Sequence, residues 1–278
     1  MNRSGRVKES GEVKDHTALV TGASSGIGLE LARCFAANGY ALILVARDQP
    51  RLEHLAQELR SQSHQPVTVI PKDLAQPNAT AELMAQITQH GLHVDLLVNN
   101  AGFGSHGLFA EADLEQQTRM VQVNVTALMQ LTRLCLPDMI SRHRGKILNV
   151  ASTAAFQPGP LMAVYYATKA FVVSFSRALE NELAGTGVTV TALCPGPTAT
   201  EFQRRAGVER TRLMTQRIMD AQTVARIGYD ALMRGQAIVI PGARNRLLAS
   251  AVRFLPARLV MAAVRKMQED RKRISPSR

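Results

Sequence analysis

Tyr165 and Lys169 are four residues apart in a stretch with helical periodicity, so both side chains are expected on one face of a helix. The pKa of a free phenol is about 10, which is too high for base chemistry at neutral pH. A nearby lysine ammonium favours the phenolate and would lower that pKa. The pair therefore predicts a group that gives a proton to a carbonyl oxygen or removes one from an alcohol. Tyr166 is only three residues from Lys169 and does not fit the same register.

Two further polar side chains could complete such a site. Ser152 follows an apolar stretch, and its hydroxyl could hydrogen-bond a substrate oxygen that gains negative charge. A turn cap is the alternative, and Thr153 is a neighbouring rival. Asn124 lies among valines in a helical stretch, where an amide needs a hydrogen-bond partner. The residues alone leave open whether Asn124 is catalytic or structural.

A glycine-rich loop, Thr21 to Gly28, follows the first apolar stretch and opens the first helical one. In this context Gly22 permits a tight turn, and Gly26 lets the backbone approach a pyrophosphate at the helix N-terminus. Gly28 allows close packing of helix against strand. The loop predicts a dinucleotide site.

The end of the second apolar stretch indicates which dinucleotide. A site for NAD needs a carboxylate there for the ribose 2′-hydroxyl, whereas this chain has Ala46 and then Arg47. A guanidinium can hold a 2′-phosphate by charge-assisted hydrogen bonds. We therefore expect NADP(H), although Asp48 is adjacent.

Apolar stretches alternate with helical ones along the chain, and the expected elements are as follows. Strands are predicted at 16–20, 41–45, 66–70, 94–98, 145–151, 188–194 and 237–240, and helices at 27–38, 50–61, 80–90, 114–141 and 163–185. Nearly all-apolar strands separated by helices predict an α/β fold, a single Rossmann-type doubly wound parallel sheet with helices on both faces. Ligands of such sheets bind beyond the carboxyl ends of the strands.

The order and separation of these motifs over residues 16–243 resemble the short-chain dehydrogenase/reductase family, in an NADP-preferring form similar to bacterial acyl-chain and steroid ketoreductases. The resemblance implies that Asp73 and Leu74 lie near the adenine, that the turn 99–102 lines the cofactor, and that 195–200 meets the nicotinamide. It selects Ser152 over Thr153, and implies that Asn124 bends its helix and holds a water linked to Lys169.

The resemblance thus yields two sets of site residues. The expected catalytic residues are Asn124, Ser152, Tyr165 and Lys169. The expected cofactor-binding residues are Gly22, Ser24, Ser25, Gly26, Ile27, Gly28, Arg47, Asp73, Leu74, Asn100, Ala101, Gly102, Tyr165, Lys169, Pro195, Gly196, Thr198 and Thr200. No metal site is expected: the close pair His90 and His93 flanks Gly91 in a predicted loop.

Three regions are expected: a flexible leader at 1–15, a catalytic domain at 16–243 with a lid at about 198–219, and a tail at 244–278. The candidate pocket residues are Phe103, Phe156, Leu161, Met162, Phe202 and Met214. The lid arginines Arg204, Arg205, Arg210 and Arg212 either attract a substrate with an acidic carrier or form a solvated helix face.

Charge is concentrated in the tail. The chain carries a net charge of +11, and residues 244–278 contain ten Lys/Arg and two Asp/Glu. Pro256 divides the tail into two amphipathic helical pieces, which could lie on an anionic membrane, cover the substrate cleft or join subunits. Nucleic-acid binding is not expected, because the basic run lacks interleaved aromatic residues.

The leading interpretation is an NADP(H)-dependent oxidoreductase acting on a small-molecule ketone or 3-oxoacyl compound. Alternatives are an oxidising alcohol dehydrogenase, a catalytically idle NADPH-binding scaffold acting through the tail, and a membrane-docking protein. The polar N-terminus, the three scattered cysteines and the lack of a long apolar run favour a cytoplasmic protein, peripheral membrane contact being the alternative. A homo-oligomer, dimer or tetramer, is typical of the family.

Overall fold

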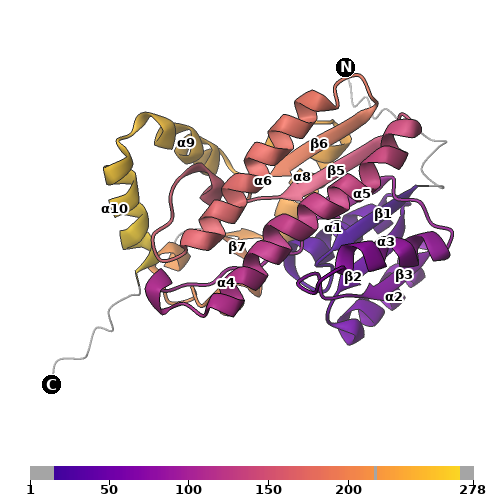
Figure 1. Cartoon of the computed structure of the whole chain (residues 1–278), viewed down its shortest axis with the longest axis horizontal. Coiled ribbons are helices and arrows are strands. Elements are labelled where there is room, and N and C mark those ends of the chain that lie inside the picture. The colour runs from indigo at the N-terminus through magenta and orange to yellow at the C-terminus, as the bar shows by residue number, and fades with distance from the viewer. Residues whose placement is uncertain (1–15, 216–217, 270–278) are drawn as a thin grey trace, which may run out of the picture.

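The computed structural model describes residues 16–215 and 218–269 (Figure 1). The predicted leader and the last residues of the predicted tail lie outside this part. A seven-stranded sheet forms the centre, with strand order β3-β2-β1-β4-β5-β6-β9 and every pairing parallel. The strands are β1 (Thr17–Thr21), β2 (Ala41–Ala46), β3 (Val67–Pro71), β4 (Leu96–Asn99), β5 (Gly145–Val150), β6 (Val188–Leu193) and β9 (Ile238–Val239). The order of the strands reverses at β1: β2 and β3 lie on one side of it, and β4, β5 and β6 lie on the other. Folds of this kind bind their ligands at such a reversal, here between β1 and β4.

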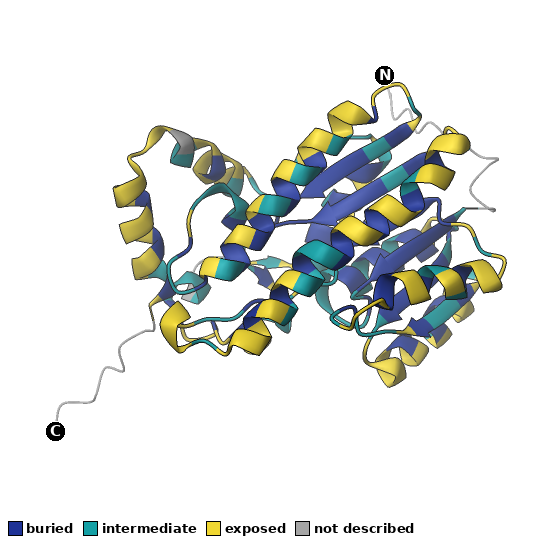
Figure 2. Cartoon of the chain, viewed as in Figure 1, coloured by how far each residue is buried: buried dark blue, intermediate teal, exposed yellow. Residues whose placement is uncertain are grey.

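Helices cover both faces of the sheet, as predicted (Figures 1 and 2). On one face lie α1 (Gly26–Ala37), α2 (Gln49–Ser63) and α8 (Ala221–Met233), which bury residues such as Phe35, Leu52 and Val224. On the other lie α3 (Ala79–Gln89), α5 (Leu128–Ser141) and α6 (Ala163–Glu182). Strand residues point alternately to the two faces, so Val20 belongs to the first core and Leu19 to the second. The doubly wound α/β fold is confirmed.

The predicted helix at 114–141 contains a change of winding. It consists of α4 (Leu114–Val121), a π-helical segment at Gln122–Ala127 and α5, which follow one another without a break. A π turn accommodates an extra residue and is frequent at functional sites. Asn124 lies inside this segment.

One of the helices that cover the sheet escaped the sequence prediction. The helix α8 packs against α1 and the sheet, and its buried residues are Val224, Ala225, Gly228, Ala231 and Leu232. These residues recur at helical spacing, but the small alanines and glycine weaken the apolar signal. Gly228 allows α8 to approach β6 closely, because a Cβ here would stand 2.7 Å from a methyl carbon of Leu193.

The predicted lid and tail contain short elements of their own. The lid holds β7 (Thr198–Ala199), α7 (Phe202–Ala206), a 3₁₀ segment at Arg212–Thr215 and β8 (Met219–Asp220). The tail forms α9 (Ala243–Ala251), a 3₁₀ turn at Val252–Phe254 and α10 (Ala257–Gln268), with Pro256 between them as expected. Among the described residues, no helix is both long and apolar enough to cross a membrane.

Candidate active site

A cavity of about 910 Å³ opens at the carboxyl ends of the strands and runs under the lid and tail helices. It is lined by all but two of the residues in the two predicted sets of site residues. These are Gly22, Ser24, Ser25, Gly26, Ile27, Arg47, Asp73, Leu74, Asn100, Ala101, Gly102, Ser152, Tyr165, Lys169, Pro195, Gly196, Thr198 and Thr200. Gly28 and Asn124 are the two exceptions, and both lie behind the cavity wall.

The Thr21 hydroxyl fixes the glycine-rich loop against the end of β4. It donates a hydrogen bond to the Val98 carbonyl at 3.0 Å and accepts from the amides of Asn100 and Ala101 at 3.0 and 3.1 Å. Gly22 and Gly26 have φ angles of 66° and 59°, in the left-handed region that favours glycine. Ser25 precedes α1, and its side chain accepts no capping hydrogen bond from this helix. The first backbone amides of α1 are therefore available to other acceptors.

Gly28 provides close packing rather than cavity surface. A Cβ here would stand 2.3 Å from Asn100 Nδ2 and 2.4 Å from the Gly22 carbonyl oxygen. We expect Gly28→Ala to lower the free energy of unfolding by about 1–3 kcal/mol in denaturant titration, because neither neighbour can move freely. Gly91→Ala is a reference for backbone strain alone, since φ there is 67° and no atom lies within 4 Å. A Gly28→Ala variant as stable as wild type would contradict a packing role for Gly28.

Arg47 and Asp48 follow β2 and differ in whether their charges are paired within the protein. The Asp48 carboxylate caps α2 by accepting from the Arg51 amide at 3.1 Å, and it pairs with the Arg51 guanidinium at 3.3 Å. Arg47 is exposed, lines the cavity, and has no ion-pair partner among the described residues. The Asp48 carboxylate, which had argued against a 2′-phosphate here, is therefore bonded to Arg51. The Arg47 guanidinium is available to bind an anion.

Tyr165, Lys169 and Ser152 meet near the middle of the cavity. Both Tyr165 and Lys169 lie on α6, one turn apart, and are buried. The Lys169 ammonium donates to the Val150 carbonyl at 2.7 Å and lies 5.9 Å from the centre of the Tyr165 ring. Ser152 follows β5, and its hydroxyl accepts from the Ala154 amide at 3.1 Å. It therefore caps the next turn as well as facing the cavity.

The pKa values of this group differ from the sequence prediction. Burial raises the pKa of Tyr165 above its usual value, opposed by a hydrogen bond with the Ser152 side chain. Burial also lowers the pKa of Lys169 to about 8. With the protein's own groups alone, the pKa of Tyr165 is thus raised and not lowered as expected, because desolvation is the largest effect on the phenol. At neutral pH Tyr165 is a phenol and can donate a proton.

Asn124 does not line the cavity, but it is hydrogen-bonded to residues next to it. Its amide nitrogen donates to the Phe103 carbonyl at 3.0 Å and to the Thr168 hydroxyl at 3.1 Å, and its oxygen accepts from the Phe103 amide at 3.1 Å. The residue is 1% exposed. These bonds join the π-helical segment, the loop after β4 and α6, which carries Tyr165 and Lys169.

The cofactor-side wall contains one prediction that must be corrected. Asn99 does not line the cavity, because it is the last residue of β4 and points to the opposite face of the sheet. There its amide donates to Thr132 and Asn149 at 3.0 and 2.9 Å. Asp73 lines the cavity as predicted and pairs with Arg119 at 2.8 Å, a contact that sequence spacing does not indicate.

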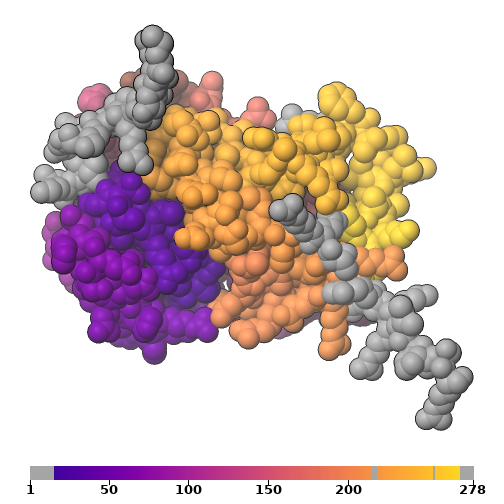
Figure 3. All heavy atoms as spheres, turned by 180° about the vertical axis from the view of Figure 1, so that it is seen from behind, coloured from indigo at the N-terminus to yellow at the C-terminus, as the bar shows by residue number. Residues whose placement is uncertain are grey.

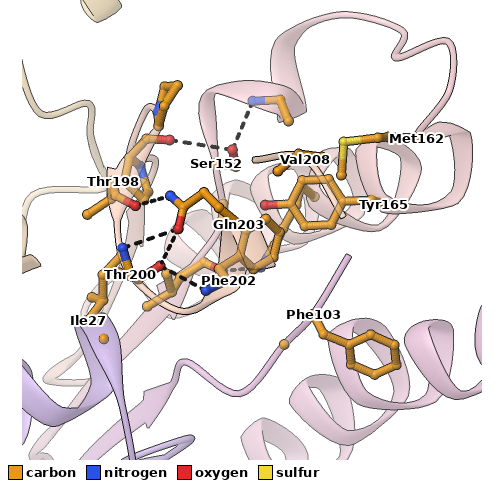
Figure 4. A pocket seen from close by; sticks show the side chains of 18 of the residues that line it. Ile27, Phe103, Ser152, Met162, Tyr165, Thr198, Thr200, Phe202, Gln203 and Val208 are labelled. Carbon is orange, nitrogen blue, oxygen red and sulfur yellow. Dashed lines mark hydrogen bonds between the residues drawn. The ribbon is translucent and has the colours of Figure 1, made fainter. Parts of the chain in front are cut away.

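The lid is held by polar contacts around Gln203 (Figure 4). Its amide oxygen accepts from the Thr200 amide and hydroxyl at 3.2 and 3.3 Å, and its nitrogen donates to the Thr198 carbonyl. The centre of the Phe202 ring, from the same turn, stands 5.3 Å from the centre of the Tyr165 ring, so the predicted lid segment forms a wall of the cavity beside Tyr165. Gln203 was not predicted, since its partners lie in a loop without local pattern.

The predicted pocket residues divide into two groups. Phe103, Met162, Phe202 and Met214 line the cavity, although Figure 4 shows the Phe103 ring turned away from Tyr165. Phe156 and Leu161 do not line it.

The lid arginines do not all face solvent freely. Arg204 and Arg205 pair with Glu201 at 3.7 and 2.7 Å, and Glu201 also binds Arg51 of α2 at 2.9 Å. The lid is thereby tied to the cofactor side.

The tail helices form the remaining wall, which the sequence left as one of three alternatives. The cavity lining from the tail comprises Asn245, Leu248, Ala249, Val252, Leu255, Val260, Ala263, Val264, Met267 and Gln268. His106 binds the end of α10: its Nε2 lies 2.8 Å from the Gln268 carbonyl. Gln268 Nε2 also donates to the Tyr166 hydroxyl at 2.9 Å. The apolar residues of the tail had indicated an amphipathic helix, but only tertiary contacts reveal what its apolar face covers.

Known proteins are similar to this chain in sequence and fold. The short chain dehydrogenase family model matches residues 16–210. A short-chain dehydrogenase from Sphingobium yanoikuyae, solved in complex with NADPH, is 32% identical, covers 94% of this chain and 99% of its own, and superposes with a TM-score of 0.79. The bulky-bulky ketone specific alcohol dehydrogenase from Comamonas testosteroni is 30% identical, with coverage of 95% and 100% and a TM-score of 0.74.

A curated relative is similar over a shorter region. The very-long-chain 3-oxoacyl-CoA reductase of Phaeosphaeria nodorum is 41% identical over 178 residues, which are 62% of this chain and 52% of that protein. The family model alone spans more than half of the chain and includes the strands β1 to β6, the glycine-rich loop and the Tyr165–Lys169 pair. This chain therefore belongs to the short-chain dehydrogenase family, as its motifs had indicated.

Proposed function

We propose that this chain is an NADPH-dependent reductase that converts the carbonyl group of an apolar compound to an alcohol. One observation carries the proposal: the glycine-rich loop, Arg47 and the Tyr165–Ser152–Lys169 group all open into one cavity with an apolar far wall. The catalytic unit we assign is 16–243, with a lid at about 198–219, and the tail completes the pocket.

The residues present fit NADP(H). Gly22 and Gly26 leave a cradle of backbone beside the start of α1, whose first amides favour a pyrophosphate. Arg47 offers a planar cation for a 2′-phosphate, and the engagement of Asp48 with α2 removes a competing carboxylate. The similarity to a neighbour that holds NADPH supports the same choice. We assign Asp73 and Leu74 to the adenine side, and Pro195 to Thr200 to the nicotinamide side.

Bound NADPH would supply the hydride that forms the new C–H bond at the carbonyl carbon. Tyr165 would donate the phenolic proton to the carbonyl oxygen, and the neutral phenol that burial favours is the form this step needs. Ser152 would hydrogen-bond the same oxygen as charge develops. Lys169, still an ammonium below pH 8, would stabilise the phenolate left behind, which then regains a proton from solvent. Asn124 is a positioning residue in this scheme.

The apolar wall of the cavity supports a proposal for the substrate class. Met162, Phe202, Val208, Val260 and Val264 surround the space beyond Tyr165. Arg205 lines the cavity, but Glu201 pairs with both Arg204 and Arg205 and offsets their charge, which argues against attraction of an acidic carrier. We propose a bulky or long-chain ketone or 3-oxoacyl compound, in line with the names of two similar proteins.

The test is oxidation of NADPH and of NADH in parallel, against ketones, aldehydes and 3-oxoacyl thioesters of increasing chain length. We expect turnover with NADPH, and a kcat/KM that rises with the apolar size of the substrate. Tight NADPH binding without turnover of any of these compounds would instead favour a binding protein.

The pH dependence of kcat/KM should reflect the ionisation of Lys169. We expect kcat/KM for NADPH, which follows the free enzyme, to be flat below about pH 7 and to fall as pH rises through about 8, because the ammonium loses its proton there. Tyr165 would titrate later, since its pKa is raised. Lys169→Arg keeps a cation at all these values and should move the falling limb upward. A limb that stays near pH 8 in this variant would exclude Lys169 as its source.

A further inference from the structure

The tail helices expose an unusual amount of apolar surface. Six large apolar side chains between 244 and 269 are exposed, and Phe254, at 87%, is the most exposed large apolar residue among those described. The six are Leu247, Leu248, Phe254, Leu255, Leu259 and Met261. Contiguous exposed apolar residues of this kind mark interaction sites rather than ordinary surface.

Cations lie among these apolar side chains. Arg244 and Arg246 on α9 and Arg258 and Lys266 on α10 are exposed. None of the four forms a salt bridge with another described residue, and Glu269 is the one acidic residue described between 244 and 269. Figure 3 shows both helices together at one end of the molecule. An apolar surface with unpaired cations matches an anionic lipid interface, where apolar groups enter the acyl boundary and cations meet headgroups.

This surface is continuous with the cavity. Leu248 and Leu255 line the cavity and are also 50% and 53% exposed. On α10, Val260 and Val264 face inward to the cavity while Leu259 and Lys266 on other faces are exposed. An apolar path therefore runs from the exposed tail surface to the pocket that holds Tyr165.

We propose that the tail surface, formed by Leu247, Phe254, Leu255 and Leu259 with Arg244, Arg246, Arg258 and Lys266, docks on an anionic lipid bilayer and admits a lipid-dissolved carbonyl substrate directly to the cavity. The charge argues against a second copy of the chain as the occupant: two such surfaces would bring the same unpaired cations together. The part concerning substrate rests on the proposed function, whereas docking does not.

Docking is tested by flotation of the full chain with vesicles of phosphatidylcholine, alone or with about one third phosphatidylglycerol. We expect flotation with the anionic vesicles only, weakened when NaCl is raised from about 0.1 to 0.5 M. Protein that stays unbound with anionic vesicles at low salt would overturn the proposal. Dimers in gel filtration that Phe254→Ser splits into monomers would also overturn it, since a second copy would then cover the surface.

The matched variants are a tail pair and a remote pair. Phe254→Ser with Leu259→Ser removes two exposed side chains that do not line the cavity. Leu134→Ser with Ile140→Ser removes two exposed side chains of α5. We expect the tail pair to weaken vesicle affinity by about tenfold or more and the remote pair to leave it within about twofold. Equal affinities of the two variants would contradict docking through the tail.

Turnover separates docking from the proposed chemistry. The tail pair should reduce a small water-soluble aldehyde at the wild-type rate, because its cavity is intact. With a long-chain ketone dissolved in the vesicles, wild-type turnover should be about fivefold or more faster on anionic than on neutral vesicles, and the tail pair should lose this gain. Absence of that gain in a wild type that floats and reduces the aldehyde would overturn substrate delivery alone. Absence of all turnover in a protein that floats would count against the proposed function and leave docking supported.

Discussion

Tyr165→Phe is expected to lower kcat for carbonyl reduction by about a thousandfold while leaving the dissociation constant of NADPH nearly unchanged. The substitution removes one hydroxyl and leaves the buried ring packed against Phe202. No other described acid approaches the site in the same way, because Ser152 is a weak acid and the Lys169 ammonium is bonded to the Val150 carbonyl. Steady-state kinetics and the change of nicotinamide fluorescence on binding would measure the two quantities.

Tyr166→Phe is the matched control for this experiment. Tyr166 also lies on α6 and lines the cavity, but its hydroxyl accepts from Gln268 at the end of α10. Its loss should change kcat by less than about tenfold and act mainly on KM for large substrates. Residual turnover of Tyr165→Phe close to that of Tyr166→Phe would contradict the assigned proton donor.

Residues that act through local geometry could be predicted from the sequence. The glycine-rich loop and the pair Tyr165–Lys169 are defined by short spacings within one strand-to-helix turn or one helix, and both line the cavity. Arg47 was found because it follows directly on a strand. Asn124 needed the resemblance to known proteins: its role depends on Phe103 and Thr168, which are distant in sequence.

Features that depend on tertiary contacts could not be predicted in the same way. Asn99 was assigned to the cofactor side with its neighbours, but the alternation of strand side chains turns it into the opposite core. The roles of Gln203 and Arg119 depend on their contacts with Thr198 and Asp73, respectively. The pKa of Tyr165 was misjudged because a sequence shows the nearby charge and not the desolvation.

The prediction of the tail helices was limited in the same way. Its apolar pattern was recognised, and the division at Pro256 was correct. The pattern could not distinguish an inner face from an outer one, because both carry leucine and valine. Val260 and Val264 cover the cavity, whereas Phe254 and Leu259 face outward.

The choice of cofactor should reverse on substitution of Arg47. We expect Arg47→Asp to lower kcat/KM for NADPH relative to NADH by about a thousandfold, and Arg47→Ser by roughly thirtyfold. The serine variant loses the charge-assisted hydrogen bonds to a 2′-phosphate, worth about 1.5–3 kcal/mol. The aspartate variant adds repulsion of the phosphate and can accept from the 2′-hydroxyl of NADH. Parallel kinetics with the two cofactors give the ratio.

Arg51→Ser is the appropriate control, because it removes a neighbouring arginine that is already engaged. Arg51 is paired with Glu201 and Asp48 and does not line the cavity. Its loss should leave the NADPH-to-NADH ratio within about threefold of wild type, since an exposed ion pair contributes little. The comparison isolates the free guanidinium of Arg47 from the positive charge of the region as a whole. If Arg51→Ser shifted the ratio as far as Arg47→Ser does, cofactor preference would depend on that general field, and the 2′-phosphate contact assigned to Arg47 would be wrong.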